Sequence, residues 1–172
     1  MNRRDLESML LTLESTPALL VRAAEKLSDA QVRQEPAGGG FSFIENVWHL
    51  ADLEREGYAV RIRRILGEDE PYLADFEGDR VARERDYKRL SLAEGLAAFA
   101  VARERNVQKL RSIHNSDWNR RGHQDNFGTI SLADVPRMMT EHDREHTSEV
   151  ADLLAHIVEG KEFRPHPTSA VA

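Results

Sequence analysis

The chain has 172 residues, with 24 Lys and Arg against 30 Asp and Glu, and its formal net charge is −6. It contains no cysteine, which excludes disulfides, thiolate metal sites, iron–sulfur clusters and a cysteine nucleophile. Because an acidic chain has no overall basic field, we expect neither nucleic acid nor an anionic membrane as a partner. No run of uncharged apolar residues approaches the length of a membrane span, so we expect a cytoplasmic globular protein.

Helical spacing of leucines predicts a first helix over about residues 3–27, which Pro17 is expected to kink or split. The segment 35–40, rich in Gly, is a helix breaker. A second helix is predicted over 42–66. It opens at Ser42-Phe43-Ile44-Glu45, a capping box in which Ser and Glu each bond the other's backbone N–H.

The second half of the chain predicts a short helix near 79–88 and two further long helices. Ser91-Leu92-Ala93-Glu94 and Ser131-Leu132-Ala133-Asp134 are the capping boxes that open these helices, which continue to about residues 113 and 159. No period-2 alternation or hairpin signal predicts a strand. We therefore expect an all-α protein, a four-helix bundle with long connections, with residues 1–163 as one domain and 164–172 as a flexible tail.

The last predicted helix carries two histidines in the middle of its apolar face. Its apolar positions recur every three or four residues, at Leu132, Val135, Met139, Val150, Leu153 and Ile157, and His142 and His146 continue the same stripe. A buried imidazole without a partner costs about 1–3 kcal/mol. Two interpretations satisfy the pair: a shared metal ion, or hydrogen bonds to carboxylates of a neighbouring helix.

A third metal ligand is expected from another helix, and His49 in the second helix is the best candidate. It lies on the edge of that helix's apolar arc, where a structural histidine is the alternative interpretation. Three imidazoles with an open coordination position are typical of a catalytic site for Zn²⁺ or Ni²⁺, with Fe²⁺ or Mn²⁺ also compatible.

Several short motifs resemble the DinB/YfiT-like superfamily of metal-binding four-helix bundles. They are Trp48-His49-Leu50-Ala51-Asp52, His142-Asp143-Arg144-Glu145-His146, the Phe127–Leu132 lead-in to the last helix, and Ser91–Glu94 followed by Phe99 and Arg103. The resemblance covers nearly the whole chain, and it implies that His49, His142 and His146 are the metal ligands. Where many relatives carry Gln three residues after the last ligand, this chain has Glu149.

Glu149 is the candidate catalytic residue, as a base for a water molecule on the metal. A fourth metal ligand and an ion-pair partner for a core arginine are the other readings. Asp52, Asp143 and Glu145 are candidates to orient the ligand rings, although Asp143 and Glu145 can instead face solvent. His123 either borders the pocket or lies at a loop tip.

The sequence supports two kinds of function. The first is a metal-dependent enzyme acting on a small molecule. The resemblance implies a thiol S-transferase that uses a low-molecular-weight thiol such as bacillithiol or mycothiol, or a metal-dependent hydrolase. Arginines near the pocket mouth, with Arg103 and Arg61 as the candidates, would hold a carboxylate of the thiol. The second is a non-catalytic, metal-stabilised module. Extra apolar residues on the first helix, among them Leu11 and Leu19, indicate a homodimer.

Overall fold

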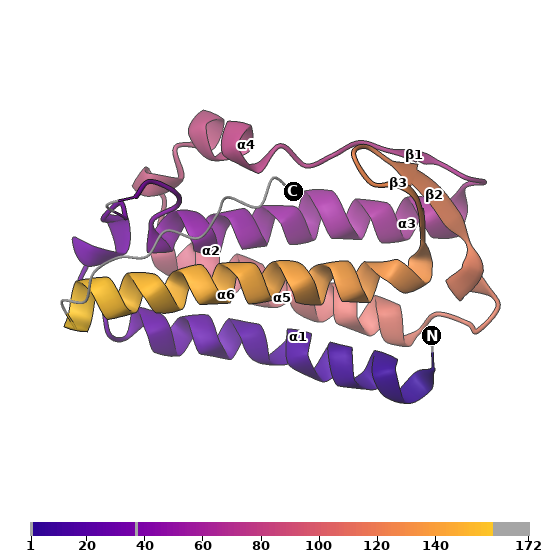
Figure 1. Cartoon of the computed structure of the whole chain (residues 1–172), viewed down its shortest axis with the longest axis horizontal. Helices are drawn as coiled ribbons and strands as arrows, with labels where there is room; N and C mark the ends of the chain where they lie inside the picture. The colour runs from indigo at the N-terminus through magenta and orange to yellow at the C-terminus, as the bar shows by residue number, and fades with distance from the viewer. Residues whose placement is uncertain (1, 37, 160–172) are drawn as a thin grey trace.

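The computed structural model describes residues 2–36 and 38–159 and shows four long helical rods lying side by side (Figure 1). The rods are α1 (Arg3–Ala24), a continuous rod made of α2 (Phe43–Asp52), η2 (Leu53–Tyr58) and α3 (Ala59–Gly67), then α5 (Leu92–Arg111) and α6 (Val135–Glu159). α1 packs against α5 and α6, and α2 packs against α5. The predicted four-helix bundle is confirmed, while the predicted tail, residues 164–172, lies outside the described residues.

The predicted helix starts form as the capping chemistry requires. The Glu45 carboxylate accepts hydrogen bonds from the backbone N–H and the hydroxyl of Ser42, at 2.9 and 2.5 Å. Asp134 accepts the same two bonds from Ser131, at 2.9 and 2.6 Å, and this box opens the short 3₁₀ turn η5 (Leu132–Asp134) that leads into α6. These bonds satisfy backbone groups that a helix start leaves without an intrahelical partner.

Pro17 lies inside α1 and does not split it, so that part of the prediction is wrong. Proline has no N–H, so the Leu13 carbonyl one turn earlier loses its usual helical donor. The side chain of Arg103 replaces that donor, because its Nη1 donates to the Leu13 carbonyl at 3.0 Å. The helix therefore continues through the proline with its freed carbonyl satisfied from α5.

The second rod changes from α to π geometry at η2 and back to α geometry at α3. A π turn admits an extra residue into a helix and is often found at functional sites. Here it lies directly after the segment that carries His49. Glu54, at this turn, is buried in the bundle and contacts Arg103 and Asn106 of α5.

The predicted fold class is confirmed, although a small sheet that was not predicted lies at one end of the bundle (Figure 1). Its strands are β1 (Tyr72–Leu73), β2 (Arg121–Gln124) and β3 (Gly128–Ser131), in the order β1-β2-β3. β1 runs parallel to β2, and β3 pairs antiparallel to β2 with His123 opposite Thr129. The buried positions of β2 are Gly122 and Gln124, so buried and exposed residues alternate along the strand. The buried residues are not large and apolar, which is why the hydrophobic pattern of the sequence did not predict a strand.

The connection between the second and third rods crosses the outside of the bundle. It contains α4 (Gly78–Arg85) and the turn η3 (Tyr87–Arg89), which together confirm the short predicted helix. The buried carboxylate of Asp52 on α2 accepts a hydrogen bond from the Tyr87 hydroxyl at 2.6 Å. It also forms an ion pair with Arg85. These contacts fasten the connection to the helix that carries His49.

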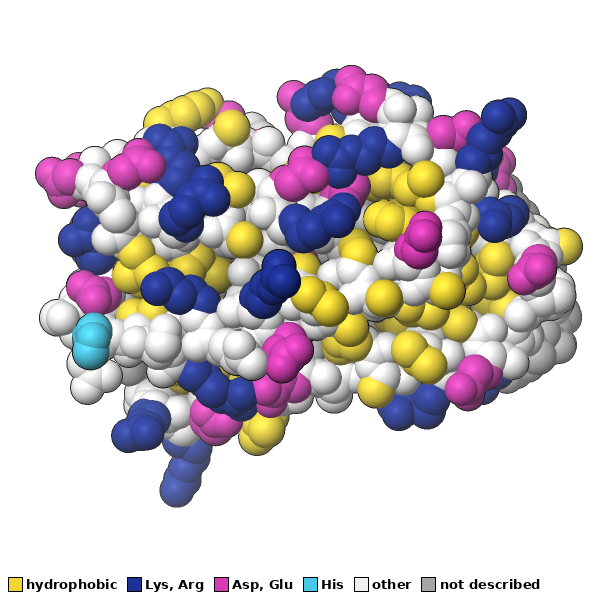
Figure 2. All heavy atoms as spheres, turned by 180° about the vertical axis from the view of Figure 1, so that it is seen from behind, with side chains coloured by type: hydrophobic (Ala, Val, Ile, Leu, Met, Phe, Trp, Pro, Cys, Tyr) yellow, Lys and Arg dark blue, Asp and Glu magenta, His cyan; other side chains and the backbone are white. Residues whose placement is uncertain are grey.

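Seen from behind, the surface carries charged side chains of both signs with hydrophobic side chains gathered between them (Figure 2). Within residues 2–36 and 38–159, no helix combines the length and the apolar character that crossing a membrane requires.

Candidate metal centre

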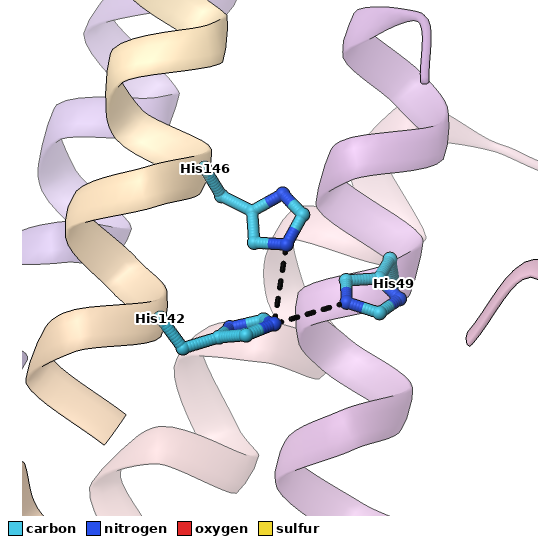
Figure 3. A group of neighbouring side chains, drawn as sticks. All are labelled: His49, His142 and His146. Carbon is cyan, nitrogen blue, oxygen red and sulfur yellow. Dashed lines mark hydrogen bonds between the residues drawn. The ribbon is translucent and has the colours of Figure 1, made fainter. Parts of the chain in front are cut away.

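Three histidines from two helices converge in the interior of the bundle. His142 and His146 come from α6, His49 comes from α2, and all three are buried. The Nε2 atom of His142 lies 3.2 Å from Nε2 of His49 and 3.2 Å from Nε2 of His146 (Figure 3). The sequence prediction that these three side chains meet is therefore confirmed.

The spacing of the three nitrogens fits one bound metal ion. Nitrogen ligands about 2.0–2.1 Å from a tetrahedral Zn²⁺ lie about 3.3 Å from one another, and two of the observed separations are 3.2 Å. One ligand atom from each residue lies within 4.8 Å of the others. Neutral imidazole nitrogens suit Zn²⁺, Ni²⁺ and Fe²⁺, so the donor set matches a divalent cation.

The hydrogen bonds of His146 show which of its nitrogens is free. Its Nδ1 lies 2.6 Å from Oδ1 of Asn46, and the Asn46 amide nitrogen donates to the carbonyls of Phe41 and Ser42. The amide oxygen therefore faces His146 as an acceptor, and the ring proton is on Nδ1. A neutral ring with its proton on Nδ1 has a lone pair on Nε2, the atom that faces the other two histidines.

His49 is held by packing. Its ring centroid lies 5.3 Å from that of Phe41 and 5.8 Å from that of Phe76. Gly78, the first residue of α4, covers the ring so closely that a Cβ atom there would lie 2.7 Å from His49 Nδ1. Only a residue without a side chain leaves the ring in this position.

Burial keeps His49 and His142 uncharged. Desolvation lowers the pKa of His49 well below its ordinary value, and the nearby His146 lowers it further. Desolvation also lowers the pKa of His142, with added repulsion from His146, His49 and Arg103. A metal ligand must be a neutral imidazole, so both rings are in the state that binds a cation at neutral pH.

The histidines belong to a polar layer that separates two apolar clusters. One cluster contains Leu13, Val107 and Met139, and the other contains Leu20, Phe99 and Val150. Between them along α1, α5 and α6 lie buried polar side chains, and on the second rod two such side chains lie on either side of the boundary between the clusters. These residues are Thr16 on α1, Arg103 on α5, His142, Asp143 and His146 on α6, and His49 and Glu54 on the second rod. The apolar clusters stabilise the bundle, and the polar layer contains the three histidines and the buried charged groups around them.

A pocket of about 980 Å³ opens beside the cluster. All three histidines line it, together with the aromatic residues Phe41, Phe76 and Tyr87. Much of the opposite wall comes from the connection containing α4. Pockets of this size with a few convergent polar groups are typical of small-molecule sites.

Glu149 also lines this pocket, and its Oε2 lies 3.2 Å from Nδ1 of His146. Nδ1 is on the side of the ring that faces away from the three converging nitrogens. The predicted role of an ion-pair partner for a core arginine belongs to other residues, because Arg103 pairs with Asp143 and Glu54. Glu149 therefore lies beside the ring of His146 and faces the pocket.

Some predicted secondary roles fall on different residues. Asn46 orients His146. The sequence feature that could have identified Asn46 is its position three residues before His49, on the same helix face. Asp52 contacts Tyr87 and Arg85, and Glu145 lines the pocket. Asp143 is buried against Arg103, so its predicted solvent-facing alternative is wrong.

The two arginines expected at the pocket mouth are also buried elsewhere. Arg103 contacts Asp143 and Glu54, and Arg61 pairs with Asp75 and lies over the ring of Tyr58. His123 is exposed in β2 against Tyr72 and is not among the residues that line the pocket.

Comparison with known proteins agrees with this architecture. YfiT of Bacillus subtilis, named "Putative metal-dependent hydrolase YfiT", is 24% identical over 148 residues, which are 86% of this chain and 83% of the relative. A relative from Oceanobacillus iheyensis, named "Putative metal-dependent hydrolase OB0782", is 23% identical over 141 residues, which are 82% of this chain and 81% of the relative. A solved structure of YfiT, described as having "an unusual four-helix bundle topology", superposes with a TM-score of 0.84 at 22% identity and covers 91% of this chain and 90% of that one.

The family model of the DinB superfamily matches residues 12–150, a span that includes all three histidines. Because this match covers most of the chain, the protein belongs to the DinB superfamily.

Proposed function

We propose that this protein is a metal-dependent hydrolase of small molecules, with a divalent cation held by His49, His142 and His146. The observation that carries the proposal is the convergence of three buried Nε2 atoms beside an open pocket. The relatives named as metal-dependent hydrolases support it. A divalent cation held by imidazoles supplies Lewis acidity, which lowers the pKa of water toward 7 and polarises a carbonyl group.

The side chains around the cluster divide the remaining work. Asn46 holds the proton of His146 on Nδ1, and this keeps Nε2 available as a ligand. Phe41 and Phe76 pack around His49 and exclude water from that side of the ring. Glu149 faces the pocket with a carboxylate that can accept a proton from an attacking water molecule.

The experiment combines metal analysis with a hydrolysis assay. The purified protein is stripped with a chelator, reloaded separately with Zn²⁺, Ni²⁺, Fe²⁺ or Mn²⁺, and assayed on a panel of activated esters and amides. We expect one ion per chain, hydrolysis only after reloading, and loss of both in His142→Ala. A wild-type protein that binds no divalent metal, or that binds it without hydrolysing any member of the panel, contradicts the proposal.

Glu149→Gln separates the roles open to that residue. If its carboxylate takes up a proton during the reaction, kcat falls while metal affinity stays at the wild-type value. If the carboxylate acts by holding the His146 ring, metal affinity falls as well.

The second candidate is a thiol S-transferase, favoured by a pocket of about 980 Å³ that all three histidines line. Because the chain has no cysteine, the thiol must be external. In the test, bacillithiol or mycothiol is incubated with a chloro-substituted electrophile and the reloaded protein. The thiolate sulfur displaces chloride, and the thiol proton goes to the buffer. Metal-dependent appearance of the thioether favours this reaction, and its absence leaves hydrolysis.

We also propose that the protein forms a homodimer through α1. Leu11, Leu19 and Val21 are exposed on this helix, although large apolar side chains are usually covered. Sedimentation of the wild type beside Leu11→Glu tests this proposal. We expect a dimer for the wild type and a monomer for the variant, whereas a monomeric wild type overturns it and leaves no dimeric binding module.

A further inference from the structure

A single guanidinium group contacts all four rods of the bundle. Arg103, on α5, is 1% exposed. Its Nη1 donates to the Leu13 carbonyl on α1 at 3.0 Å, and its two terminal nitrogens donate to the carboxylate of Asp143 on α6 at 2.5 and 2.7 Å. Its Nη2 also lies 2.9 Å from Oε1 of Glu54 on the second rod. One side chain therefore fastens the other three rods to α5.

Two of the backbone carbonyls that accept hydrogen bonds from α5 side chains lie where the other helices depart from regular α geometry. The Leu13 carbonyl is free because Pro17 has no N–H. Glu54 lies in the π turn η2, and Asn106 of α5 donates to its carbonyl and its carboxylate, at 2.9 and 2.7 Å. Because both irregular sites point their acceptors at α5, the rods have one favoured rotation relative to that helix.

The carboxylates that Arg103 holds are close in sequence to the metal-site histidines. Asp143 directly follows His142, and successive helical side chains point about 100° apart. Fixing Asp143 toward α5 therefore turns His142 toward α2. Glu54 follows His49 by five residues on the second rod, and fixing it likewise sets the rotation of the segment that carries His49.

Two of the histidines depend on the position of their helices more than His146 does. Within the described residues, Nδ1 of His49 and Nδ1 of His142 have no hydrogen-bond partner, whereas Nδ1 of His146 bonds Asn46. A metal ligand without such a bond has no neighbouring polar group to aim its ring. The orientation of His49 and His142 must then come from packing and from the rotation of α2 and α6.

We propose that Arg103 is the positioning residue of the metal centre, which sets the rotation of α2 and α6 by holding Glu54 and Asp143 together. The inference rests on the proposed function, because it requires that the histidines bind a metal. Arg103 donates to none of the three rings and acts through the helices.

The test measures metal affinity and coordination separately from stability. Arg103→Lys keeps the charge and loses the forked geometry that grips two partners. Because a variant that leaves two buried carboxylates unpaired can fail to fold, the second variant is the triple change Arg103→Met, Glu54→Gln and Asp143→Asn, which removes all three charges. Leu110→Ala, a buried truncation on the same helix, is the control for lost stability. Each protein is stripped and titrated with Zn²⁺ against a chromophoric chelator, and with Co²⁺ while its visible spectrum is recorded.

We expect the Zn²⁺ dissociation constant to rise about 10-fold or more in Arg103→Lys and further in the triple variant, with an altered Co²⁺ spectrum in both. Leu110→Ala should lower the melting temperature and leave the spectrum and the dissociation constant unchanged. If the triple variant folds and keeps the wild-type Zn²⁺ affinity and Co²⁺ spectrum, the positioning role of Arg103 is wrong, while the proposed metal site is unaffected. A wild-type protein that binds neither metal removes the proposed function and the positioning role together.

Discussion

Nδ1 of His146 lies 2.6 Å from the side-chain oxygen of Asn46, and this contact joins the two helices that form the metal centre. Asn46 is one helical turn before His49, so the same face of α2 supplies one candidate ligand and the group that orients another. The amide nitrogen of Asn46 is anchored on the carbonyls of Phe41 and Ser42. The first turn of α2 therefore helps to fix the orientation of the His146 ring.

Replacing Asn46 with Ala should weaken metal binding about 10-fold or more, because the ring of His146 loses the acceptor that fixes its proton on Nδ1. The measurement is Zn²⁺ competition with a chromophoric chelator. Asn115→Ala, at an exposed position in the loop after α5, is the control and should bind like the wild type. Equal affinity in Asn46→Ala would show that Glu149 alone holds the ring.

Gly78→Ala should lower metal affinity with little loss of helix content. The new Cβ would lie 2.7 Å from His49 Nδ1 and closer still to Cε1, so the ring or the start of α4 must move. Gly67→Ala is the matched control, because a Cβ at Gly67 meets nothing within 4 Å. Circular dichroism and Co²⁺ absorption are recorded for both variants. An unchanged Co²⁺ spectrum in Gly78→Ala would mean that α4 yields and His49 stays in place.

The stability of the metal-stripped protein should fall in mildly acidic solution. Burial lowers the folded-state pKa of His49 and of His142, so below about pH 6.5 the unfolded chain binds more protons than the folded one. The free energy of unfolding is therefore retained above about pH 7. It declines as the pH drops from about 6.5 toward the folded-state pKa values, by up to about 1.4 kcal/mol per pH unit for each histidine.

Urea unfolding at a series of pH values measures this slope in the presence of a chelator. His142→Gln removes one of the two buried groups and should reduce the slope by about half. The exposed His114 serves as the control, and His114→Gln should leave the slope as it is in the wild type. A wild-type slope near zero between pH 5 and 7 would contradict the prediction.

Tyr87→Phe should destabilise the protein by roughly 1–2 kcal/mol, because the buried carboxylate of Asp52 loses a hydrogen bond of 2.6 Å. Tyr72→Phe provides the comparison. Its hydroxyl also bonds a carboxylate, that of Asp125, but the residue is 54% exposed, so water replaces the lost bond. Chemical denaturation gives both free energies, and equal losses in the two variants would rule out burial as the cause.

Local chemistry made most of the helices predictable. The capping boxes at Ser42 and Ser131 form as expected, and the second rod ends at Gly67, one residue beyond the predicted end at residue 66. The apolar stripe of α6 was traceable because a helix buries every third or fourth residue. His142 and His146 lie on that stripe, which is why their burial was predictable without a structure.

The sheet and the π turn were not predictable, for two different reasons. β2 buries Gly122 and Gln124 in place of large apolar residues, so no local pattern predicts the strand. Its parallel partner β1 lies about fifty residues away in the chain, so no turn between the two strands predicts their pairing. The π turn changes the hydrogen-bond spacing within a sequence that is helical throughout.

The amino-acid sequence by itself determined the helical rods, most of their starts and ends, and the burial of His142 and His146, because these follow from hydrogen bonding and periodicity within single segments. His49 was one of two open interpretations until the family resemblance singled it out as the third member of the cluster. Only the tertiary structure decided that Asn46 orients His146, that Gly78 covers His49, and that Arg103 is buried among carboxylates and not at the pocket mouth. Those contacts join residues from different helices, so they depend on how the rods rotate against one another. That rotation is set by the packed interior as a whole.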